Sequence, residues 1–308
     1  MALFLTHLPW RDLLRLIRWP NLTLVLVCLL AFHRVLLRIC PPASSCLTLK
    51  GADLALFVLV AMIITASGYV INDLKDFQTD GINRPERTLV MHQVPPSTVW
   101  PWYITLVVFG FVLAALIAWR TDQWMWLPLY PLITGGLYSY ATWWKGIPLW
   151  GNLLVALLTA LLPLTLLLPE REWLSQLPAE TFHDTMKIFI GFAFLSLSTS
   201  FYREWIKDME DIRGDREAGW MTWAVIHGLD RARSLAVCWG ILSILTLLAG
   251  VFLWTGHLWS QLLLGAAAML QSCMLILLFR PDYPAHLRQI SQSAKWTLAM
   301  GLVAVLSL

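Results

Sequence analysis

The sequence predicts an all-α polytopic membrane protein, and its composition, its repeated apolar runs and its tryptophans indicate this class. Of 308 residues, 58% are hydrophobic and only 13% are charged, whereas soluble domains carry about 25% charged residues. The apolar residues recur in long runs from about residue 19 onwards. Tryptophans cluster near the ends of these runs, as in the aromatic belts of membrane interfaces. The net charge is only +3, without a long basic run, so we expect no nucleic-acid partner.

Nine apolar runs are candidates for spans, because a helix needs about 20 largely apolar residues to cross the hydrocarbon core. They cover residues 19–39, 52–72, 98–118, 123–141, 149–169, 184–202, 233–255, 258–279 and 290–308. Before them, residues 1–18 are charged and amphipathic, which predicts an interfacial helix on the cytoplasmic surface rather than a cleavable signal peptide. We expect residues 1–308 to form a single intramembrane domain.

Lysine and arginine are divided unequally between the two sides of this topology. With the N-terminus in the cytoplasm, fifteen of them fall on the cytoplasmic side and six on the opposite side. Because such residues accumulate in cytoplasmic loops, the C-terminus is expected outside a plasma or inner membrane.

Cysteine and histidine do not form a recognisable metal motif. The five cysteines include no CxxC pair and the seven histidines lie far apart, which argues against zinc, haem and iron–sulfur sites. Cys40 and Cys46 fall in the predicted external loop after the first span, where an oxidising compartment would permit a disulfide. Nothing else in the sequence supports that bond.

Two acidic segments with one spacing follow the second and sixth predicted spans. The first runs from Asn72 to Asp80 and the second from Asp208 to Asp215. Both read D-x-x-D-x-x-x-D, and each aspartate of the first lies 135 residues before its counterpart in the second. Positions i, i+3 and i+7 share one helix face. Each segment therefore predicts a stripe of carboxylates where a helix leaves the bilayer.

These stripes predict a bound cation. Neighbouring carboxylates repel one another, and the C-terminal end of a helix dipole disfavours negative charge. Mg²⁺ takes one or two carboxylates and fills its other positions with phosphate oxygens and water. Two such stripes flanking one cavity would bind a diphosphate through Mg²⁺. The alternative, two solvated helix ends with accidental spacing, does not account for the duplication.

Basic residues near the stripes are candidates for binding phosphate oxygens and stabilising a departing diphosphate. They are Arg84, Arg87, Lys145, Arg203 and Lys207. For Arg84 and Arg87, ordinary cytoplasmic positive charge is an equally good interpretation.

Polar residues within the spans form a further group of candidates. They are Asn21, Tyr138, Tyr140, Asn152 and Tyr202. Such side chains either bind ligand or satisfy neighbouring helices, and the sequence leaves both open.

The two acidic segments resemble the signatures of the UbiA superfamily of intramembrane prenyltransferases, N-D-x-x-D-x-x-x-D after the second helix and D-x-x-D-x-x-x-D after the sixth. Their tails, GINRPERTL and REAGWMTWAVIHGLDRAR, also resemble the family, as do LYSYATWWKGIPLWGNLLVA and RWPNLTL. The resemblance covers nearly the whole chain. It departs after the first motif, where many members have a Gly-containing turn and this chain has Thr88 and Met91-His92-Gln93. That departure concerns the local cap conformation.

The resemblance implies nine helices around a central cavity, a cytoplasmic cap formed by the 2–3 and 6–7 loops, a polyprenyl diphosphate donor and Mg²⁺. It implies metal–diphosphate ligands at Asn72, Asp76, Asp80, Asp208, Asp211 and Asp215. On this basis we assign catalysis to Asp76, Asp80, Lys145, Asp211 and Asp215. Substrate binding is assigned to Asn21, Asn72, Asp73, Arg84, Arg87, Tyr138, Asn152, Arg203 and Lys207.

The implied reaction is Mg²⁺-dependent transfer of a polyprenyl group from its diphosphate to a lipophilic acceptor. The motifs most resemble those of the geranylgeranylglycerol-phosphate geranylgeranyltransferases of ether-lipid synthesis, which implies a geranylgeranyl donor and that acceptor. Surplus Arg213 and Arg216 would suit an acceptor phosphate. The alternatives are an aromatic acceptor of hydroxybenzoate or dihydroxynaphthoate type in quinone biosynthesis, haem, or chlorophyll-type esterification.

Two functions from other classes explain the motifs less well. A transporter places its site near the bilayer midplane, whereas these aspartates lie at the predicted cytoplasmic mouth. A non-catalytic scaffold that binds prenyl lipids has no reason to keep six mutually repelling aspartates. The sequence carries no signal for donor length or oligomeric state.

Overall fold

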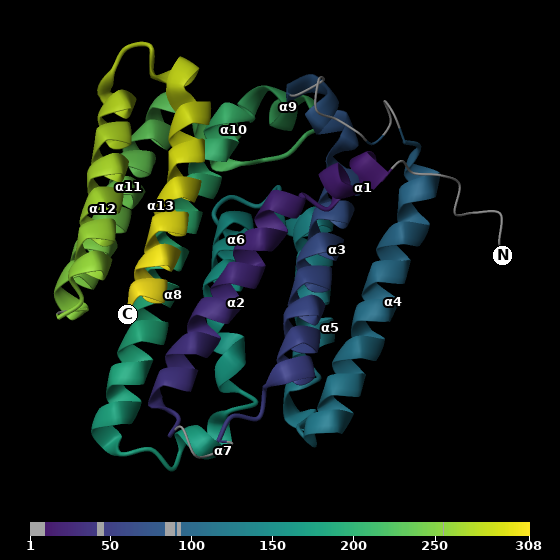
Figure 1. Ribbon diagram of the computed structural model, residues 1–308. Coiled ribbons are helices and arrows are strands. Elements are labelled where there is room, and N and C mark those ends of the chain that lie inside the picture. Colours follow the sequence, from purple (N-terminus) through teal and green to yellow (C-terminus); the bar gives the residue numbers. More distant parts are fainter. Residues whose placement is uncertain (1–9, 42–45, 84–89, 91–93, 255) are drawn as a thin grey trace. The chain divides into compact units, whose positions relative to one another are not determined.

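The computed structural model describes residues 10–41, 46–83, 90, 94–254 and 256–308, and within these residues it is helical and contains no strand. The α-helices are α1 Trp10–Leu16, α2 Trp19–Ile39, α3 Gly51–Asn83, α4 Pro96–Thr121, α5 Leu129–Ser139, α6 Trp150–Leu161, α7 Arg171–Leu174, α8 Ala179–Glu210, α9 Ile212–Glu217, α10 Trp223–His227, α11 Leu229–Leu253, α12 Leu258–Ile276 and α13 Leu287–Ser307 (Figure 1). The predicted all-α class is confirmed.

Six helices of the described chain are long and apolar enough to cross a membrane, namely α2, α3, α4, α8, α11 and α12 with its 3₁₀ extension to Phe279. They coincide with six of the nine predicted spans. The predicted spans at 123–141 and 149–169 are broken, the second where Pro163, which lacks an N–H, opens a 3₁₀ segment after α6. α13 is long, but its first half carries Arg288 and Lys295. Nine crossings therefore stay a prediction.

The chain forms two compact units, which are described separately. The first unit comprises residues 1–26 and 48–145, and the second comprises residues 27–47 and 146–308. α1, α3, α4 and α5 belong to the first unit, and α6 to α13 belong to the second. The single domain over 1–308 stays a prediction. The cytoplasmic cap also stays a prediction. Much of the loop between predicted spans 2 and 3, which joins α3 to α4, lies outside the described residues, whereas the segment between predicted spans 6 and 7 forms α9 and α10.

In the first unit, α3 packs against α4 and α5 through small residues. A Cβ at Gly110 of α4 would collide with the Tyr130 hydroxyl and with Ile63. The Tyr130 hydroxyl in turn donates to the Val107 carbonyl at 2.8 Å. Because small residues let helix backbones approach closely in membranes, this contact fixes α3 before its polar end.

The short helix α1 is amphipathic, as residues 1–18 predicted, although residues 1–9 lie outside the described part. Its Leu16 is 2% exposed and belongs to a cluster with Val70, Ile71 and Leu74 of α3. Trp10 lies on its exposed side. Such a two-sided helix suits a membrane surface, and its interfacial position stays a prediction.

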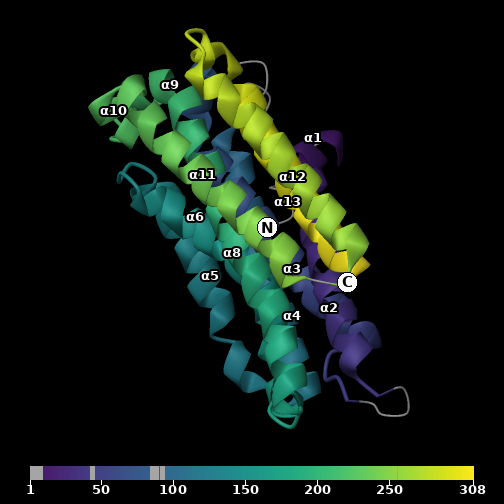
Figure 2. The ribbon, with the colours of Figure 1, turned by 90° about the vertical axis from the view of Figure 1, so that its left-hand side faces the viewer.

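In the second unit, α8 is the central helix and packs against α6, α11 and α13 (Figure 2). Two hydroxyl pairs join it to α11, Ser198 with Thr246 and Thr199 with Ser243, each at 2.8 Å. Hydroxyl pairs of this kind hold helices together where no water competes. Trp205 extends the contact by donating from Nε1 to the Ala232 carbonyl at 2.9 Å. α8 is thus held up to the start of the second acidic segment.

The structure pairs Cys40 with Cys46 as a disulfide between the end of α2 and the loop before α3. Their Cα atoms lie 6.1 Å apart, within the range that disulfides span. The pairing considered from the sequence is therefore present.

Gly240 of α11 offers a test of the packing around α8. A Cβ there would overlap Leu275 of α12 and lie 3.1 Å from the Tyr202 ring, so Gly240→Val is expected to destabilise the protein by about 1–3 kcal/mol. Gly265→Val of α12 is the control, because no atom of the described residues lies within 4 Å of its added Cβ. Thermal unfolding in detergent measures both. Equal unfolding midpoints would contradict the close packing of α8, α11 and α12.

Candidate active site

The first acidic segment lies on the last turns of α3, which continues without a break to Asn83, as the spacing predicted. Asn72 donates from Nδ2 to Asp76 Oδ2 at 2.6 Å, and Lys145 donates from Nζ to the same oxygen at 2.5 Å. Asp76 is only 2% exposed. Its second oxygen, Oδ1, is buried and has no hydrogen-bond partner among the described residues. The structure thus brings together three predicted site residues.

Lys145 reaches Asp76 through an irregular backbone. Residues Tyr140–Trp144 form a π-helical turn, and the Lys145 N–H bonds the Tyr140 carbonyl five residues earlier, at 3.0 Å. Such turns are frequent at functional sites because they redirect the side chains that follow. The position of Lys145 follows from this π-helical turn, which the hydropathy of the sequence does not predict.

Asp73, predicted to bind substrate, is engaged by an arginine that the sequence analysis counted only toward topology. Arg18 donates from Nη2 to Asp73 Oδ1 at 2.5 Å, and its guanidinium lies 4.9 Å from the centre of the Tyr69 ring. Arg18 stands between α1 and α2 with φ +51°, a conformation rare for non-glycine residues. The only sequence feature that could have pointed to Arg18 was its position at the start of the family-like segment RWPNLTL.

Two other predicted residues of the first unit lie near these groups in sequence but have different contacts. Tyr138 lies in an aromatic cluster around Lys75, whose Nζ is 5.7 Å from the Tyr138 ring and 5.5 Å from the Trp100 ring. Asn21 lies in the first turn of α2, where its backbone N–H bonds the Arg18 carbonyl at 2.8 Å. Arg84 and Arg87 lie outside the described residues.

The second acidic segment departs from the predicted single stripe. α8 ends at Glu210, Asp211 has the non-helical angles φ −93° and ψ 4°, and Asp215 lies on the separate short helix α9. Aspartate is a weak helix former, and Asp211 falls at this break. The prediction of three carboxylates on one continuous helix is therefore right for the first segment and wrong for the second.

Asp208 remains on α8 and is bound from another helix of the same unit. Asn152 of α6 donates from Nδ2 to Asp208 Oδ2 at 2.9 Å, and Asn152 is itself buried. Asp215 is also buried. The Asp208–Asn152 bond matches the Asp76–Asn72 bond of the first segment, because each segment has one aspartate that accepts from an asparagine amide.

Arg203 and Lys207 share a partner that the sequence analysis did not single out. Arg203 donates from Nη1 to Glu204 Oε1, and Lys207 donates from Nζ to Glu204 Oε2 at 3.4 Å. The glutamate side chain is 10% exposed. Tyr202, by contrast, lies wholly inside the core of the unit, which favours its packing interpretation.

The donor set of the two segments suits a hard cation. Asn72, Asp76, Asp80, Asp208, Asp211 and Asp215 offer oxygen donors alone, as Mg²⁺ prefers. The buried Oδ1 of Asp76, which has no hydrogen-bond partner among the residues that the structure describes, is an acceptor of the required kind. Among the described residues, however, no group of three or more acidic, histidine or cysteine side chains is arranged so that it could hold a metal ion.

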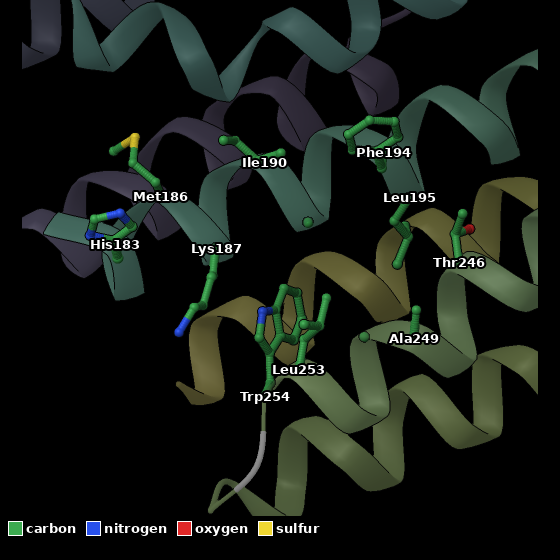
Figure 3. A pocket seen from close by; sticks show the side chains of 12 residues that line it. His183, Met186, Lys187, Ile190, Phe194, Leu195, Thr246, Ala249, Leu253 and Trp254 are labelled. Carbon is green, nitrogen blue, oxygen red and sulfur yellow. The ribbon is translucent and has the colours of Figure 1, made fainter. Parts of the chain in front are cut away.

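A cavity of about 470 Å³ lies elsewhere in the second unit, between the first half of α8 and the second half of α11 (Figure 3). Ile190, Phe194, Leu253 and Trp254 line it, with Lys187 at one end. None of the predicted site residues is among its lining residues. It therefore does not represent the implied central cavity.

Comparison with known proteins defines the class. The sequence profile of the UbiA prenyltransferase family matches residues 42–299, so this chain belongs to that family and is a prenyltransferase. With its six apolar helices it is an integral membrane protein.

Relatives of this chain include two proteins named digeranylgeranylglyceryl phosphate synthase. A digeranylgeranylglyceryl phosphate synthase of Sulfurisphaera tokodaii is 34% identical over 185 residues, which cover 58% of this chain and 59% of that protein. One of Thermococcus gammatolerans is 28% identical over 255 residues, 82% of this chain and 84% of that protein.

Solved structures share the fold. One concerning digeranylgeranylglyceryl phosphate synthase in membranes superposes with a TM-score of 0.64 at 20% identity, covering 96% of this chain and 97% of that chain. A UbiA homolog from Archaeoglobus fulgidus bound to DMAPP and Mg²⁺ gives a TM-score of 0.52 at 17% identity, covering 95% and 98%.

The Arg18–Asp73 pair generates a prediction with a matched control. Arg18→Gln leaves the Asp73 carboxylate uncompensated beside Asp76. Repulsion between two like charges about 4 Å apart costs about 1 kcal/mol even in water. The uncompensated Asp73 carboxylate should therefore raise the KM for an anionic diphosphate about fivefold. Arg120→Gln breaks the similarly exposed Arg120–Asp53 pair of the same unit and should leave that KM unchanged. Steady-state kinetics of both purified variants measure this. An equal KM in both variants would refute a role for Arg18 at the site.

Proposed function

We propose that this enzyme transfers a geranylgeranyl group from its diphosphate to geranylgeranylglycerol phosphate, in a Mg²⁺-dependent step of ether-lipid synthesis. The observation that carries the proposal is the buried Asp76 carboxylate, which accepts from Asn72 and Lys145 and whose second oxygen has no hydrogen-bond partner in the described part of the chain. The names of the relatives support the acceptor, and the DMAPP and Mg²⁺ bound by the Archaeoglobus fulgidus homolog support the donor class and the metal.

In this proposal the oxygen donors of both segments hold the metal. Asn72, Asp76 and Asp80 serve from the first segment, and Asp208, Asp211 and Asp215 from the second. When bound, Mg²⁺ supplies Lewis-acid stabilisation of the diphosphate leaving group. The asparagine amides at Asp76 and Asp208 fix the orientation of one carboxylate in each segment, as supporting hydrogen bonds do for metal ligands generally.

Lys145 has two functions in this mechanism. Its ammonium compensates the buried Asp76 carboxylate in the protein without substrate. It then lies beside the leaving group, where a fixed positive charge stabilises the diphosphate as its negative charge grows. We assign substrate contacts to Asn21, Tyr138, Asn152, Arg203 and Lys207, and also to Arg84 and Arg87 of the 2–3 loop.

The proposed chemistry is ether formation at an allylic carbon. The bond between C1 of the prenyl chain and the diphosphate oxygen breaks, and its electron pair leaves with the diphosphate. The acceptor hydroxyl oxygen bonds C1, and the hydroxyl proton is released. The apolar membrane-spanning helices would keep water from the allylic cation, which water would otherwise capture as the free alcohol.

We further propose that the chain crosses the membrane nine times, with the N-terminus and the active-site cap in the cytoplasm. The six long apolar helices would be joined by the segments around α5, α6 and α13. The excess of lysine and arginine on the proposed cytoplasmic side supports this orientation. The Cys40–Cys46 disulfide supports an external position for its loop, because disulfides persist in oxidising compartments.

Replacing Asp76 tests the metal assignment. Asp76→Asn keeps the shape of the side chain and removes its charge, so Mg²⁺-dependent diphosphate release is expected to fall about 100-fold or more. Asp184→Asn is the control, because it removes an exposed carboxylate paired with Lys187. Diphosphate release from purified protein in proteoliposomes measures both. Normal turnover by a folded Asp76→Asn variant would rule out the metal site.

The acceptor is tested by product analysis. Membranes containing the protein, Mg²⁺ and geranylgeranyl diphosphate receive one acceptor at a time, and mass spectrometry identifies the product. We expect a diprenylated glycerol phosphate from geranylgeranylglycerol phosphate, and no product from hydroxybenzoate, dihydroxynaphthoate or haem. A prenylated ring would keep the reaction class and overturn the acceptor. No product from any acceptor would point first to a donor of another chain length, and then to a protein that binds prenyl lipids without turnover.

A further inference from the structure

Glu204 stands at an unexpected place for a carboxylate. It lies one helical turn before Asp208 on α8, so Glu204, Asp208 and Asp211 have the spacing i, i+4 and i+7. Another negative charge near an anion-binding site is unfavourable unless it is compensated. In the structure it is compensated, because both carboxylate oxygens accept from cations. Glu204 is therefore an unsuitable metal ligand in this arrangement and needs another explanation.

The cluster of Arg203, Glu204 and Lys207 carries one net positive charge in a half-buried position. The side chains are 21%, 10% and 26% exposed. Burying charges costs several kcal/mol unless they are paired and hydrogen-bonded, so a cation that served topology alone would stay in water. Arg213, in the same segment of the chain, is 86% exposed and only touches Glu217 at 4.0 Å. Burial thus separates Arg203 and Lys207 from the ordinary cytoplasmic cations.

The cluster keeps binding capacity for an anion. A guanidinium has five N–H donors and an ammonium has three, and one carboxylate cannot use all of them. Arg203 Nε is buried and has no hydrogen-bond partner among the described residues. A phosphate group beside Arg203 and Lys207 would receive charge-assisted bonds that are stronger than neutral ones.

We propose that Glu204 is a positioning residue, which holds Arg203 and Lys207 in place to bind the phosphate of the acceptor. This inference rests on the proposed function, in which two anions bind at once. The donor diphosphate takes the metal and the aspartates, so the acceptor phosphate requires its own cations. Arg203 lies five residues before Asp208, about 7.5 Å along the helix axis, and Lys207 directly precedes Asp208 but projects about 100° away around the helix. Its ammonium reaches back to Glu204, so both cations lie on the side of Asp208 toward the start of α8.

The kinetic test separates positioning from a general structural role. Glu204→Gln keeps the size and removes the charge that holds both cations, so the KM for geranylgeranylglycerol phosphate should rise about tenfold, the value of one charge-assisted bond. A change in KM alone indicates lost binding, so kcat and the donor KM should stay near those of the unsubstituted enzyme. Glu204→Asp should recover part of the acceptor affinity. Asp184→Asn, which removes another carboxylate paired with a lysine three residues on, should change nothing.

A binding measurement without turnover completes the test. Without Mg²⁺ or donor, geranylgeranylglycerol phosphate should raise the unfolding midpoint of the unsubstituted protein more than its dephosphorylated analogue does. Glu204→Gln should lose that difference. If Glu204→Gln does not fold, Glu204→Asp carries the test and should show the same losses to a smaller extent.

Three results would overturn the assignment: an unchanged acceptor KM, a rise in the donor KM instead, or a fall in kcat with both KM values unchanged. Failure of the unsubstituted enzyme to prenylate this acceptor would refute the proposed function itself. Normal turnover with an unaffected Glu204→Gln variant would refute only the role of Glu204.

Discussion

The burial of the Asp76 carboxylate constrains the rest of the first unit. A carboxylate that is 2% exposed must be paired, because an isolated buried charge is far too costly. Its partners come from its own helix, at Asn72, and from the end of the π-helical turn, at Lys145. The site therefore depends on where α5 ends as much as on α3. The close α3–α4–α5 packing around Gly110 is the rigid base that such a pairing needs.

The two acidic segments share a sequence spacing but not a local structure. On α3 the three positions lie on one unbroken helix, whereas Asp211 ends α8 and Asp215 follows on α9. What the segments do share is an aspartate that accepts from an asparagine amide, Asp76 from Asn72 and Asp208 from Asn152. The amide of the first is on the same helix and that of the second is on α6. An equal spacing can thus conserve the chemistry of a ligand set while the backbone that presents it differs.

The sequence was sufficient for the features that composition and spacing encode. Long apolar runs identified the six long apolar helices, and the duplicated spacing located both acidic segments. The features that the sequence did not predict depend on local helix breaks or on tertiary contacts. Pro163 breaks a run whose average hydropathy is high, and the helix break falls at Asp211, a weak helix former whose effect an i, i+3, i+7 pattern ignores. Arg18 was missed because its partner, Asp73, is 55 residues away in the sequence. Glu204 was missed for another reason: its partners Arg203 and Lys207 are one and three residues away, but the sequence analysis followed only the spacing of the aspartates.

Charge compensation also distinguishes the two kinds of acidic residue on α8. Asp208 accepts from a neutral amide, so it keeps its capacity to bind a cation when one is supplied. Glu204 already pairs with two cations, so its charge is neutralised within the protein. One turn of helix therefore separates a carboxylate that can accept a metal, Asp208, from a carboxylate that already has cations as partners, Glu204. In the proposed reaction, where a diphosphate and a phosphate monoester bind together, this arrangement would reduce the repulsion between substrates, since each anion would have its own countercharge.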